Sequence, residues 1–149
     1  MSYVYEYPRY KITCDVAVVY KDPIKDLCEL LIIRRGCSPC YGLYALPGGN
    51  LNPNERLDEC ARRELYEETG VCVGDLTLVD NFDAVNRAPG DRSISCVYLA
   101  IVDEKPDVYI GDDAISGKWI TYQEIESIDF AFDCKEMAYR AFGKVYEIV

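Results

Sequence analysis

The sequence predicts one domain of the mixed α/β class, in which strands flank a well-marked helix and a second helix lies near the C-terminus. Half of the 149 residues are hydrophobic, which is enough to bury one sizeable core. Apolar residues form short β-branched runs in several segments and change to helical spacing elsewhere. No repeat, low-complexity tract or linker divides the chain, so we expect residues 1–149 to form a single domain.

Two strands and a loop are expected before the first helix. Residues 11–20 and 28–35 are rich in apolar and β-branched residues and are separated by a turn-like segment, so they read as a pair of strands. Residues 36–54 carry several glycines and prolines around the short extended piece 43–46. This composition predicts mostly loop, where a ligand can approach the backbone.

The first helix is predicted to begin near Asn52 or Asn54, either of which can cap it, with Pro53 suited to the first helical position. Gly70 suits the left-handed residue that follows a helix, and we expect the helix to end there. The apolar positions between these limits recur at helical spacing: Leu57, Cys60, Ala61 and Leu65.

Three strands and a second helix are expected after Gly70. Residues 71–83 and 92–103 are apolar and β-branched and read as two strands, joined by a connection that contains proline and glycine. A short strand is expected around residues 118–120, and residues 133–145 are predicted to form a C-terminal helix.

The charge balance limits the possible partners and chemistry. A formal net charge of −10 disfavours unaided binding to nucleic acid, although an acidic chain can bind a phosphorylated small molecule together with a divalent cation. The chain contains no histidine, so catalysis has to use carboxylates, metals, Lys, Tyr or Cys. No apolar run approaches the length of a membrane span, and the N-terminus lacks the layout of a signal peptide. We therefore expect a cytoplasmic protein without membrane or nucleic-acid partners.

The eight cysteines are interpreted mainly as buried thiols. Several of them lie inside apolar alternations, where a thiol behaves as a small hydrophobic side chain, so a disulfide framework is not expected. Cys37 and Cys40 have the CxxC spacing of redox and zinc sites. A structural zinc site normally requires a second pair or histidines, which this chain does not offer, so this reading is the less favoured one.

Three glutamates share one face of the predicted helix: Glu64, Glu67 and Glu68. At about 100° per residue they continue the apolar, inward-facing stripe. On a solvated helix end their repulsion costs only about 0.2–0.5 kcal/mol per pair, and Arg63 can pair with Glu59 or Glu67. At 4 Å and an effective dielectric constant near 20, a partly buried pair costs about 4 kcal/mol and therefore calls for a cation or raised pKa values. Carboxylate oxygens suit Mg²⁺ or Mn²⁺.

A longer pattern surrounds these glutamates and matches GX₅EX₇REUXEEXGU, with U an aliphatic residue, at every specified position. The matching residues are Gly49, Glu55, Arg63, Glu64, Leu65, Glu67, Glu68, Gly70 and Val71. The sequence thus resembles the Nudix hydrolase family. The segments LLIIRRG, LYALPGG, NRAPGDRSISCVYLA, GDDAISGKW and FAFDCKEM are similar to motifs of its ADP-ribose pyrophosphatase-like group.

The resemblance implies a mixed β-sheet sandwiched between helices and an enzyme that hydrolyses a pyrophosphate bond with the help of a metal. The substrate would be a nucleoside diphosphate linked to another moiety, with ADP-ribose or a related NDP-sugar favoured. Glu64, Glu67 and Glu68 are the expected ligands of Mg²⁺, or of Mn²⁺, with the Gly48 carbonyl as a further ligand.

The resemblance also implies roles in catalysis. Glu64, Glu68, Asp112 and Asp113 are the candidates for the general base. Arg63 is expected to orient the carboxylates around it, since its guanidinium is always charged, and Glu55 is expected to give structural support.

Substrate contacts are expected from several residues outside the helix. Arginines can bind phosphate oxygens bidentately, and aromatic rings can stack on a base. The main candidates are Arg34, Arg87, Gly49, Tyr44 and Phe82, followed by Arg35, Arg92 and Tyr41. Arg87 is the preferred phosphate contact, while for each of these residues an ordinary surface or core position is an equal alternative.

Some positions depart from the group's usual motifs. Ala88-Pro89-Gly90 replaces a common Asp-Pro-Arg run, Ser116 a frequent glutamate, Cys134 a frequent histidine, and Tyr44 a common tryptophan. These differences leave two alternatives open: a house-cleaning (d)NTP pyrophosphatase, and a non-catalytic nucleotide-sugar sensor. A homodimer through the N-terminal tyrosines Tyr3, Tyr5, Tyr7 and Tyr10 is a further hypothesis.

Overall fold

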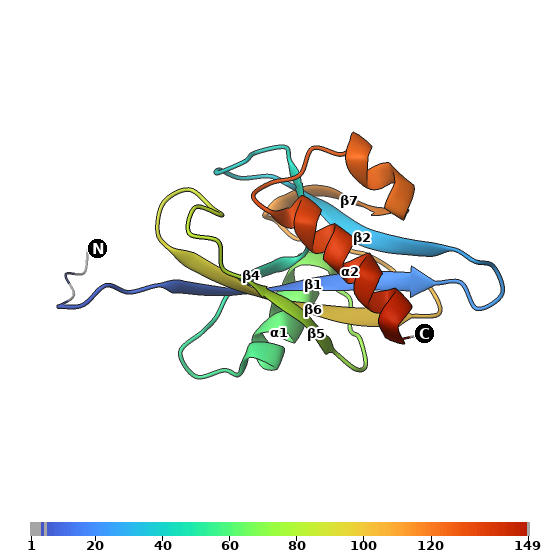
Figure 1. Cartoon of the computed structure of the whole chain (residues 1–149), viewed down its shortest axis with the longest axis horizontal. Helices are drawn as coiled ribbons and strands as arrows, with labels where there is room; N and C mark the ends of the chain where they lie inside the picture. Colours follow the sequence, from blue (N-terminus) through green and yellow to red (C-terminus); the bar gives the residue numbers. More distant parts are fainter. Residues whose placement is uncertain (1–3, 5, 149) are drawn as a thin grey trace.

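A mixed β-sheet runs through the computed structural model of the chain, which describes residue 4 and residues 6–148 (Figure 1). In chain order the elements are β1 (Lys11–Lys21), β2 (Cys28–Arg35), β3 (Tyr44–Ala45), β4 (Gly48–Asn50), α1 (Leu57–Thr69), β5 (Thr77–Phe82), β6 (Ser93–Val102), β7 (Ala114–Ile120), the 3₁₀-helix η1 (Tyr122–Ser127) and α2 (Cys134–Ile148). Tyr3 and Tyr5 of the suggested dimer segment lie outside the described residues. Within the described part of the chain, no helix is both long and apolar enough to cross a membrane.

The seven strands form a single sheet around the β1–β6 pair. Its main order is β3-β2-β1-β6-β5, while β4 adds to β1 and β7 adds to β2. β1 and β6 run parallel, in register from Lys11 beside Ser93 to Tyr20 beside Val102. The other pairings between these strands are antiparallel.

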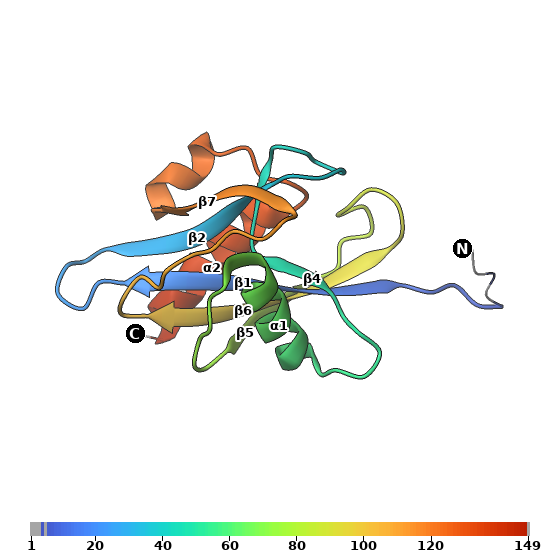
Figure 2. The same cartoon turned by 180° about the vertical axis from the view of Figure 1, so that it is seen from behind.

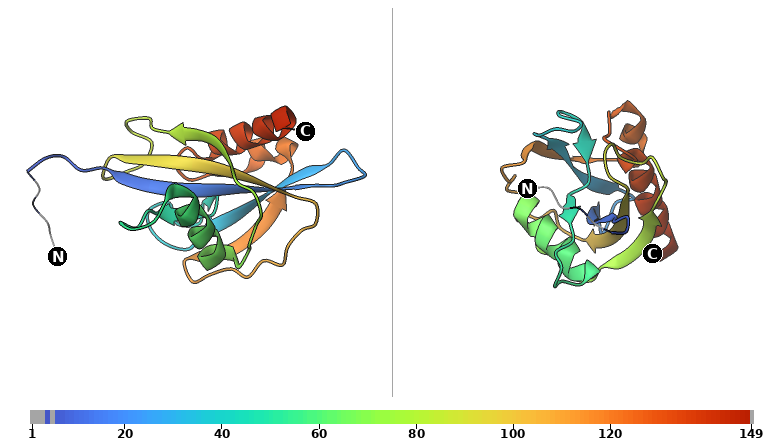
Figure 3. Two further views of the ribbon diagram at one scale, coloured as in Figure 1. Left: turned by 90° about the horizontal axis from the view of Figure 1, so that it is seen from below. Right: turned by 90° about the vertical axis from the view of Figure 1, so that its left-hand side faces the viewer.

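The two long helices cover opposite faces of the sheet, as Figures 2 and 3 show. Successive side chains of a strand point to opposite faces. On β1, Val16 and Val18 therefore pack on the α1 side, whereas Ala17 and Val19 pack on the α2 side. This arrangement confirms the expected mixed sheet sandwiched between helices.

β1 changes its antiparallel partner partway along its length, and this change opens the sheet at one end. Residues 13–15 pair with β4, whereas residues 19–21 pair with β2. β3 pairs instead with the far end of β2. Residues 44–50 therefore lie between β1 and β2 where these two strands no longer pair with each other. Side chains from both faces of the sheet can meet at this opening.

Most strand predictions are confirmed, but the expected loop over residues 36–54 was partly wrong. Residues 48–50 form β4, because the Gly-Gly backbone can pair with β1 where larger residues would collide with neighbouring side chains. The strand expected over 71–83 begins only at Thr77, and the one expected near 118–120 already begins at Ala114. The sequence reading also missed η1, whereas residues 133–145 fall almost entirely within α2.

The predicted start of the first helix was also wrong. The helix begins at Leu57 after Arg56, so neither Asn52 nor Asn54 is its cap. Glu55 accepts a hydrogen bond from the Asn52 N–H at 2.8 Å, but both residues lie before the helix. The predicted end is confirmed, because Gly70 has a φ of 71° and donates its N–H to the Tyr66 carbonyl.

Candidate active site

The two glycines of β4, Gly48 and Gly49, leave space for carboxylates on both faces of this strand. A methyl group added to Gly49 would overlap the Glu64 carboxylate, and one added to Gly48 would overlap Oδ1 of Asp15. Consecutive strand residues point to opposite faces, so Glu64 and Asp15 lie on opposite sides of β4. Each acid can lie this close to β4 only because the residue it faces is a glycine.

Glu68 reaches the edge of β4 from the last turn of α1. Its Oε2 accepts a hydrogen bond from the Gly48 N–H, with 3.1 Å between the two heavy atoms. Burial raises the pKa of the Glu68 carboxyl to about 8, against the opposing effect of this hydrogen bond. Burial likewise raises the pKa of Glu64, although Arg63 opposes the shift. Two carboxylates therefore meet at the glycine pair in surroundings that disfavour their negative charge.

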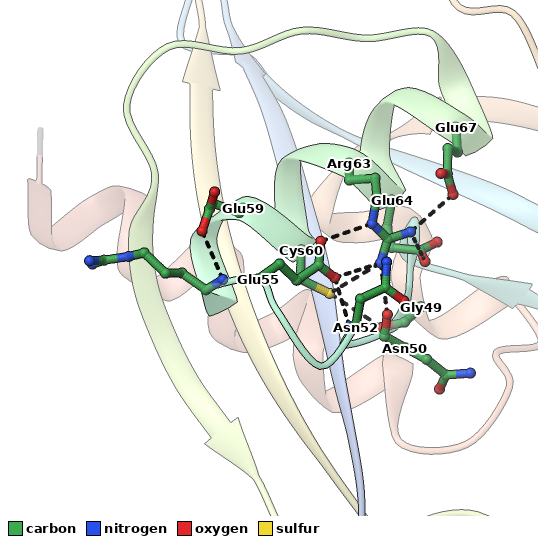
Figure 4. Close-up of polar contacts among 10 residues, drawn as sticks. Gly49, Asn50, Asn52, Glu55, Glu59, Cys60, Arg63, Glu64 and Glu67 are labelled. Carbon is green, nitrogen blue, oxygen red and sulfur yellow. Dashed lines mark hydrogen bonds and ion pairs between the residues drawn. The ribbon is translucent and has the colours of Figure 1, made fainter.

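Arg63 connects three of the four glutamates of the motif (Figure 4). Its Nε and Nη2 atoms donate to the two carboxylate oxygens of Glu55 at 3.0 and 2.7 Å. Its Nη1 donates to Glu64 at 2.8 Å and to Glu67 at 3.1 Å. Such a bidentate pair fixes both partners in orientation. The contacts are those expected of an orienting residue, and they include Glu55, the predicted support.

Further contacts of this network anchor the helix to the preceding segment. Nη2 of Arg63 donates to the Asn50 carbonyl of β4 at 2.8 Å. Glu59, an alternative partner in the sequence reading, instead accepts from the Arg56 N–H at 2.8 Å. The hydrogen bonds from Arg63 hold the pKa of Glu55 down to about 2, so this carboxylate stays charged.

Glu67 differs from the other two glutamates. Its side chain is 57% exposed, compared with 14% for Glu64, and it points out beside Arg63. Within the part of the chain that the structure describes, no three acidic or thiol side chains gather closely enough to form a complete ligand set. The metal shell of Glu64, Glu67, Glu68 and the Gly48 carbonyl thus stays a prediction.

The donor chemistry at the glycine pair nevertheless fits a divalent cation. Glu64 and Glu68 supply hard oxygen atoms, and both carry raised pKa values that a nearby positive charge would relieve. Mg²⁺ commonly binds one or two carboxylates and keeps several of its waters. These two carboxylates would hold such an ion, and bound water would complete its coordination.

A cavity of about 470 Å³ lies beside the glycine pair, where the sheet opens. Glu68, Gly48 and Gly49 line it, together with residues 87–91 of the β5–β6 connection. Its volume is within the range of small-molecule sites. The proposed metal-binding carboxylates therefore border a space suited to a small ligand.

Asp15 and Phe132 are among the cavity residues that the sequence reading missed. Asp15 lies in β1 between buried Cys14 and Val16, and its carboxylate accepts a hydrogen bond from the Ser95 hydroxyl. Burial raises its pKa to about 6. A charged residue inside an apolar strand is the sequence signal that would have identified it.

Phe132 lies before α2 and also lines the cavity. It has a φ of 53°, which is uncommon for a bulky residue and marks a constrained backbone. The guanidinium of Arg35, another lining residue, lies 5.1 Å from the centre of its ring. No sequence signal indicated this conformation, because it depends on how residues 131–134 join α2.

Most of the predicted substrate residues lie away from the cavity. Tyr44 is covered by Lys118, whose Nζ lies 4.7 Å from its ring centre, and Phe82 is buried in the core on the α2 side. Arg34 donates to the Gly42 carbonyl at 2.9 Å and is exposed. None of the three lines the cavity, whereas Gly49 does.

Arg87, the preferred phosphate contact, does line the cavity but is already paired. Its side chain is 6% exposed, and it donates to both carboxylate oxygens of Asp133, at 3.0 and 2.8 Å. A further hydrogen bond runs to the Ser93 hydroxyl at 2.8 Å. In this arrangement Arg87 joins the β5–β6 connection to the start of α2.

The remaining candidates are exposed or half-buried. Asp112 and Asp113 are exposed, Tyr41 is 68% exposed, and Arg92 donates to backbone carbonyls. Cys37 is exposed and Cys40 half-buried, and all eight cysteines are free thiols. Apart from Cys134, none of these residues lines the cavity.

Residues 14–141 match the NUDIX domain family, so the chain belongs to this family. Three curated relatives show the range of functions within it. The chain is 28% identical over 142 residues to the ADPR responsive transcriptional repressor NtrR of Acinetobacter baylyi, covering 94% of this chain but 56% of the repressor. It is 28% identical over 122 residues to an ADP-ribose pyrophosphatase of Methanocaldococcus jannaschii, covering 82% and 72%. It is 32% identical over 111 residues to the nucleoside triphosphatase NudI of Salmonella heidelberg, covering 69% and 77%.

A solved structure supports the fold. The chain resembles the NUDIX domain of Shewanella oneidensis NrtR complexed with ADP ribose, with a TM-score of 0.84 and 20% sequence identity. The match covers 93% of this chain and 90% of that domain. At this identity the likeness concerns the fold alone.

Proposed function

We propose that the protein hydrolyses the pyrophosphate bond of a nucleoside diphosphate linked to another moiety, with ADP-ribose or a related NDP-sugar as substrate. The observation that carries this proposal is the meeting of Glu64 and Glu68 at Gly48-Gly49, beside a cavity of about 470 Å³. Two partly buried carboxylates next to an anionic substrate call for a divalent cation, for which Mg²⁺ or Mn²⁺ is suited.

Three residues of the motif have parts in this chemistry. When bound, a divalent cation neutralises phosphate charge and lowers the pKa of a coordinated water. Glu64 and Glu68 would hold the ion, and Arg63 keeps Glu64 in position through its 2.8 Å hydrogen bond. Glu68 also lines the cavity, so it is the best placed of the candidate bases to accept the proton of the attacking water.

Two relatives support a substrate of this class. One is an ADP-ribose pyrophosphatase, and the other is an ADPR responsive repressor. The similarity to a nucleoside triphosphatase keeps (d)NTPs as the main alternative substrates.

A substrate panel would test this proposal. Purified protein with Mg²⁺ would be offered ADP-ribose, other NDP-sugars, dinucleotides and dNTPs, and the released phosphate esters would be measured. We expect ADP-ribose or an NDP-sugar to have the highest kcat/KM and EDTA to abolish turnover. A preference for triphosphates would favour the alternative substrate class.

A ligand sensor is the second candidate, because the A. baylyi relative is an ADPR responsive repressor. This chain spans 56% of that repressor's length, so the activity of the whole protein is itself a proposal. A sensor would bind ADP-ribose without releasing products from any member of the panel. Calorimetric binding measured beside the hydrolysis assay separates the two functions.

A further inference from the structure

In the part of the chain that the structure describes, Asp133 stands directly before α2, but its side chain accepts no hydrogen bond from this helix. Its carbonyl accepts the Met137 N–H at 3.1 Å, so the residue occupies the capping position. An aspartate there usually accepts backbone N–H groups with its carboxylate. Both carboxylate oxygens accept instead from Arg87, at 3.0 and 2.8 Å, across 46 residues of the chain. The side chain therefore contacts the β5–β6 connection rather than its own helix.

The backbone before α2 directs two consecutive side chains towards two arginines. Phe132 has a φ of 53°, which a bulky residue adopts only where its surroundings enforce it. Its ring lies 5.1 Å from the Arg35 guanidinium, whereas the next residue, Asp133, pairs with Arg87. Both arginines line the cavity, although one lies at the end of β2 and the other in the β5–β6 connection. Residues 132–133 thus fix two cationic side chains from separate segments around one cavity.

Arg87 keeps hydrogen-bond donors that no described residue accepts. Its side chain is 6% exposed, and its guanidinium carries five N–H groups. Two of them donate to Asp133 and one to the Ser93 hydroxyl at 2.8 Å. Within residue 4 and residues 6–148, the other two have no acceptor in the protein. A buried donor without an acceptor is costly, and Arg87 lines the cavity, so a ligand bound there can supply the oxygen atoms.

Asp133 fixes the orientation of this arginine and cancels its net charge. A guanidinium so little exposed is destabilising without a counterion, and the bidentate contact with Asp133 supplies one. Lys11 and Arg35 also line the cavity, and neither forms an ion pair with any described residue. These two supply positive charge that Asp133 does not neutralise. The pair of Arg87 and Asp133, which is neutral overall, contributes directed hydrogen bonds instead.

We propose that Asp133 is a positioning residue for ligand binding, because it holds the Arg87 guanidinium with two N–H groups free to donate to ligand oxygen atoms in the cavity. Such preorganisation lowers the cost of ordering a flexible side chain when the ligand binds. The inference rests on the proposed function for the identity of the ligand, and it assigns a role to a residue outside the acidic motif. Asp133 acts through Arg87 and makes no contact with the ligand itself.

The Asp133→Asn variant tests this role. The amide keeps the shape but lacks the charge and one acceptor, so Arg87 loses its bidentate partner. We expect KM for ADP-ribose to rise about 30-fold, as for lost hydrogen bonds to a charged group, while kcat stays within about threefold. An unchanged KM would overturn the proposal. A lower KM would overturn it as well, because it would show that Asp133 competes with the ligand for Arg87.

Asp80→Asn is the matched control on the same helix. Asp80 of β5 forms an ion pair with Arg140 of α2, so this pair also joins α2 to a neighbouring segment. Neither residue lines the cavity, and their side chains are 44% and 52% exposed. We expect the control to change KM and kcat by less than about twofold. An equal rise of KM in both variants would show that loosening α2 is sufficient, which would overturn the role assigned to Asp133.

Two further variants separate positioning from folding. Asp133→Glu retains the charge and both acceptor oxygens, so we expect KM to stay within about fivefold of that of the unmodified protein. Arg87→Met combined with Asp133→Leu replaces the ion pair with apolar residues of similar size, which is often neutral for stability. We expect this double variant to fold and to show the raised KM of Asp133→Asn. An unchanged KM in the folded double variant would contradict the proposal.

Binding measurements distinguish failure of this inference from failure of the proposed function. ADP is titrated by calorimetry with Ca²⁺ in place of Mg²⁺ into the unmodified protein, Asp133→Asn and Asp80→Asn. If no nucleotide is hydrolysed but Asp133→Asn alone weakens ADP binding about 30-fold, the proposed hydrolysis fails and the role of Asp133 stands. If ADP-ribose is hydrolysed and Asp133→Asn changes neither KM nor the affinity for ADP, hydrolysis stands and this inference fails. Absence of ADP binding to the unmodified protein would overturn both.

Discussion

The two long helices cover opposite faces of one sheet but differ in what they bury. α2 buries large side chains such as Met137 and Phe142 against the apolar residues of β1, β2 and β6. α1 buries one large apolar side chain, Leu65, beside the small Cys60 and Ala61, and turns Glu64 towards β4 where another apolar residue would add stability. One face of the sheet is therefore built mainly for stability, whereas the other gives up apolar burial to position carboxylates.

The largest expected effect comes from Glu68 on α1. Glu68→Gln removes the charge at the glycine pair but keeps the shape, so we expect kcat to fall about 10³-fold while the Tm stays the same or rises. Glu67→Gln is the matched variant on the exposed side of the same turn and should cost about tenfold. Steady-state kinetics and thermal unfolding measure both. Equal losses in the two variants would contradict the distinction between buried and exposed glutamates.

The corresponding change on α2 should affect stability rather than chemistry. Phe142 is buried beneath this helix, and Phe142→Ala should lower the free energy of unfolding by about 3 kcal/mol through the cavity it leaves. Tyr146→Ala, at a side chain 62% exposed on the same helix, should change it by less than about 0.5 kcal/mol. Urea unfolding gives both values. The kcat of folded Phe142→Ala protein should stay within about twofold, and a large loss would link α2 to catalysis.

The pH dependence of stability should report on the buried carboxyl groups near the glycine pair. The pKa of Glu68 is raised to about 8, so the folded state keeps a proton that the unfolded state has already released. Between about pH 4.5 and 8 the metal-free protein should therefore lose stability as pH rises, on the order of 5 kcal/mol from this group. Unfolding in EDTA across this range measures the loss. Mg²⁺ should reduce this loss, because cation binding favours the charged carboxylates. A stability that does not change with pH would contradict the raised pKa of Glu68.

The smallest expected effect concerns the aromatic wall of the cavity. Phe132→Ala removes a ring that lines the cavity, so KM for ADP-ribose should rise about tenfold while kcat stays within about twofold. Initial-rate kinetics separate the two constants. A fall in kcat at unchanged KM would show that Phe132 positions the reacting groups rather than the ligand.

Local patterns in the sequence predicted much of the fold. β1 and β2 follow from dense apolar and β-branched runs, and the end of α1 follows from Gly70, which has the left-handed conformation expected of it. The start of α1 did not follow, because Glu55 is held by Arg63, eight residues later, and this contact lies outside any local capping rule. β4 was missed because glycines usually indicate loops, and only their pairing with β1 makes these residues a strand.

The sequence by itself determined the family and the presence of an acidic helix face, because the spacing of the motif residues is a local property of the chain. Only the tertiary structure decided which acids approach the glycine pair, that Arg87 is paired with Asp133, and that Asp15 lies in the cavity wall. These features join segments dozens of residues apart. Their geometry depends on where β1 stops pairing with β4 and begins to pair with β2, and no local sequence pattern predicts this position.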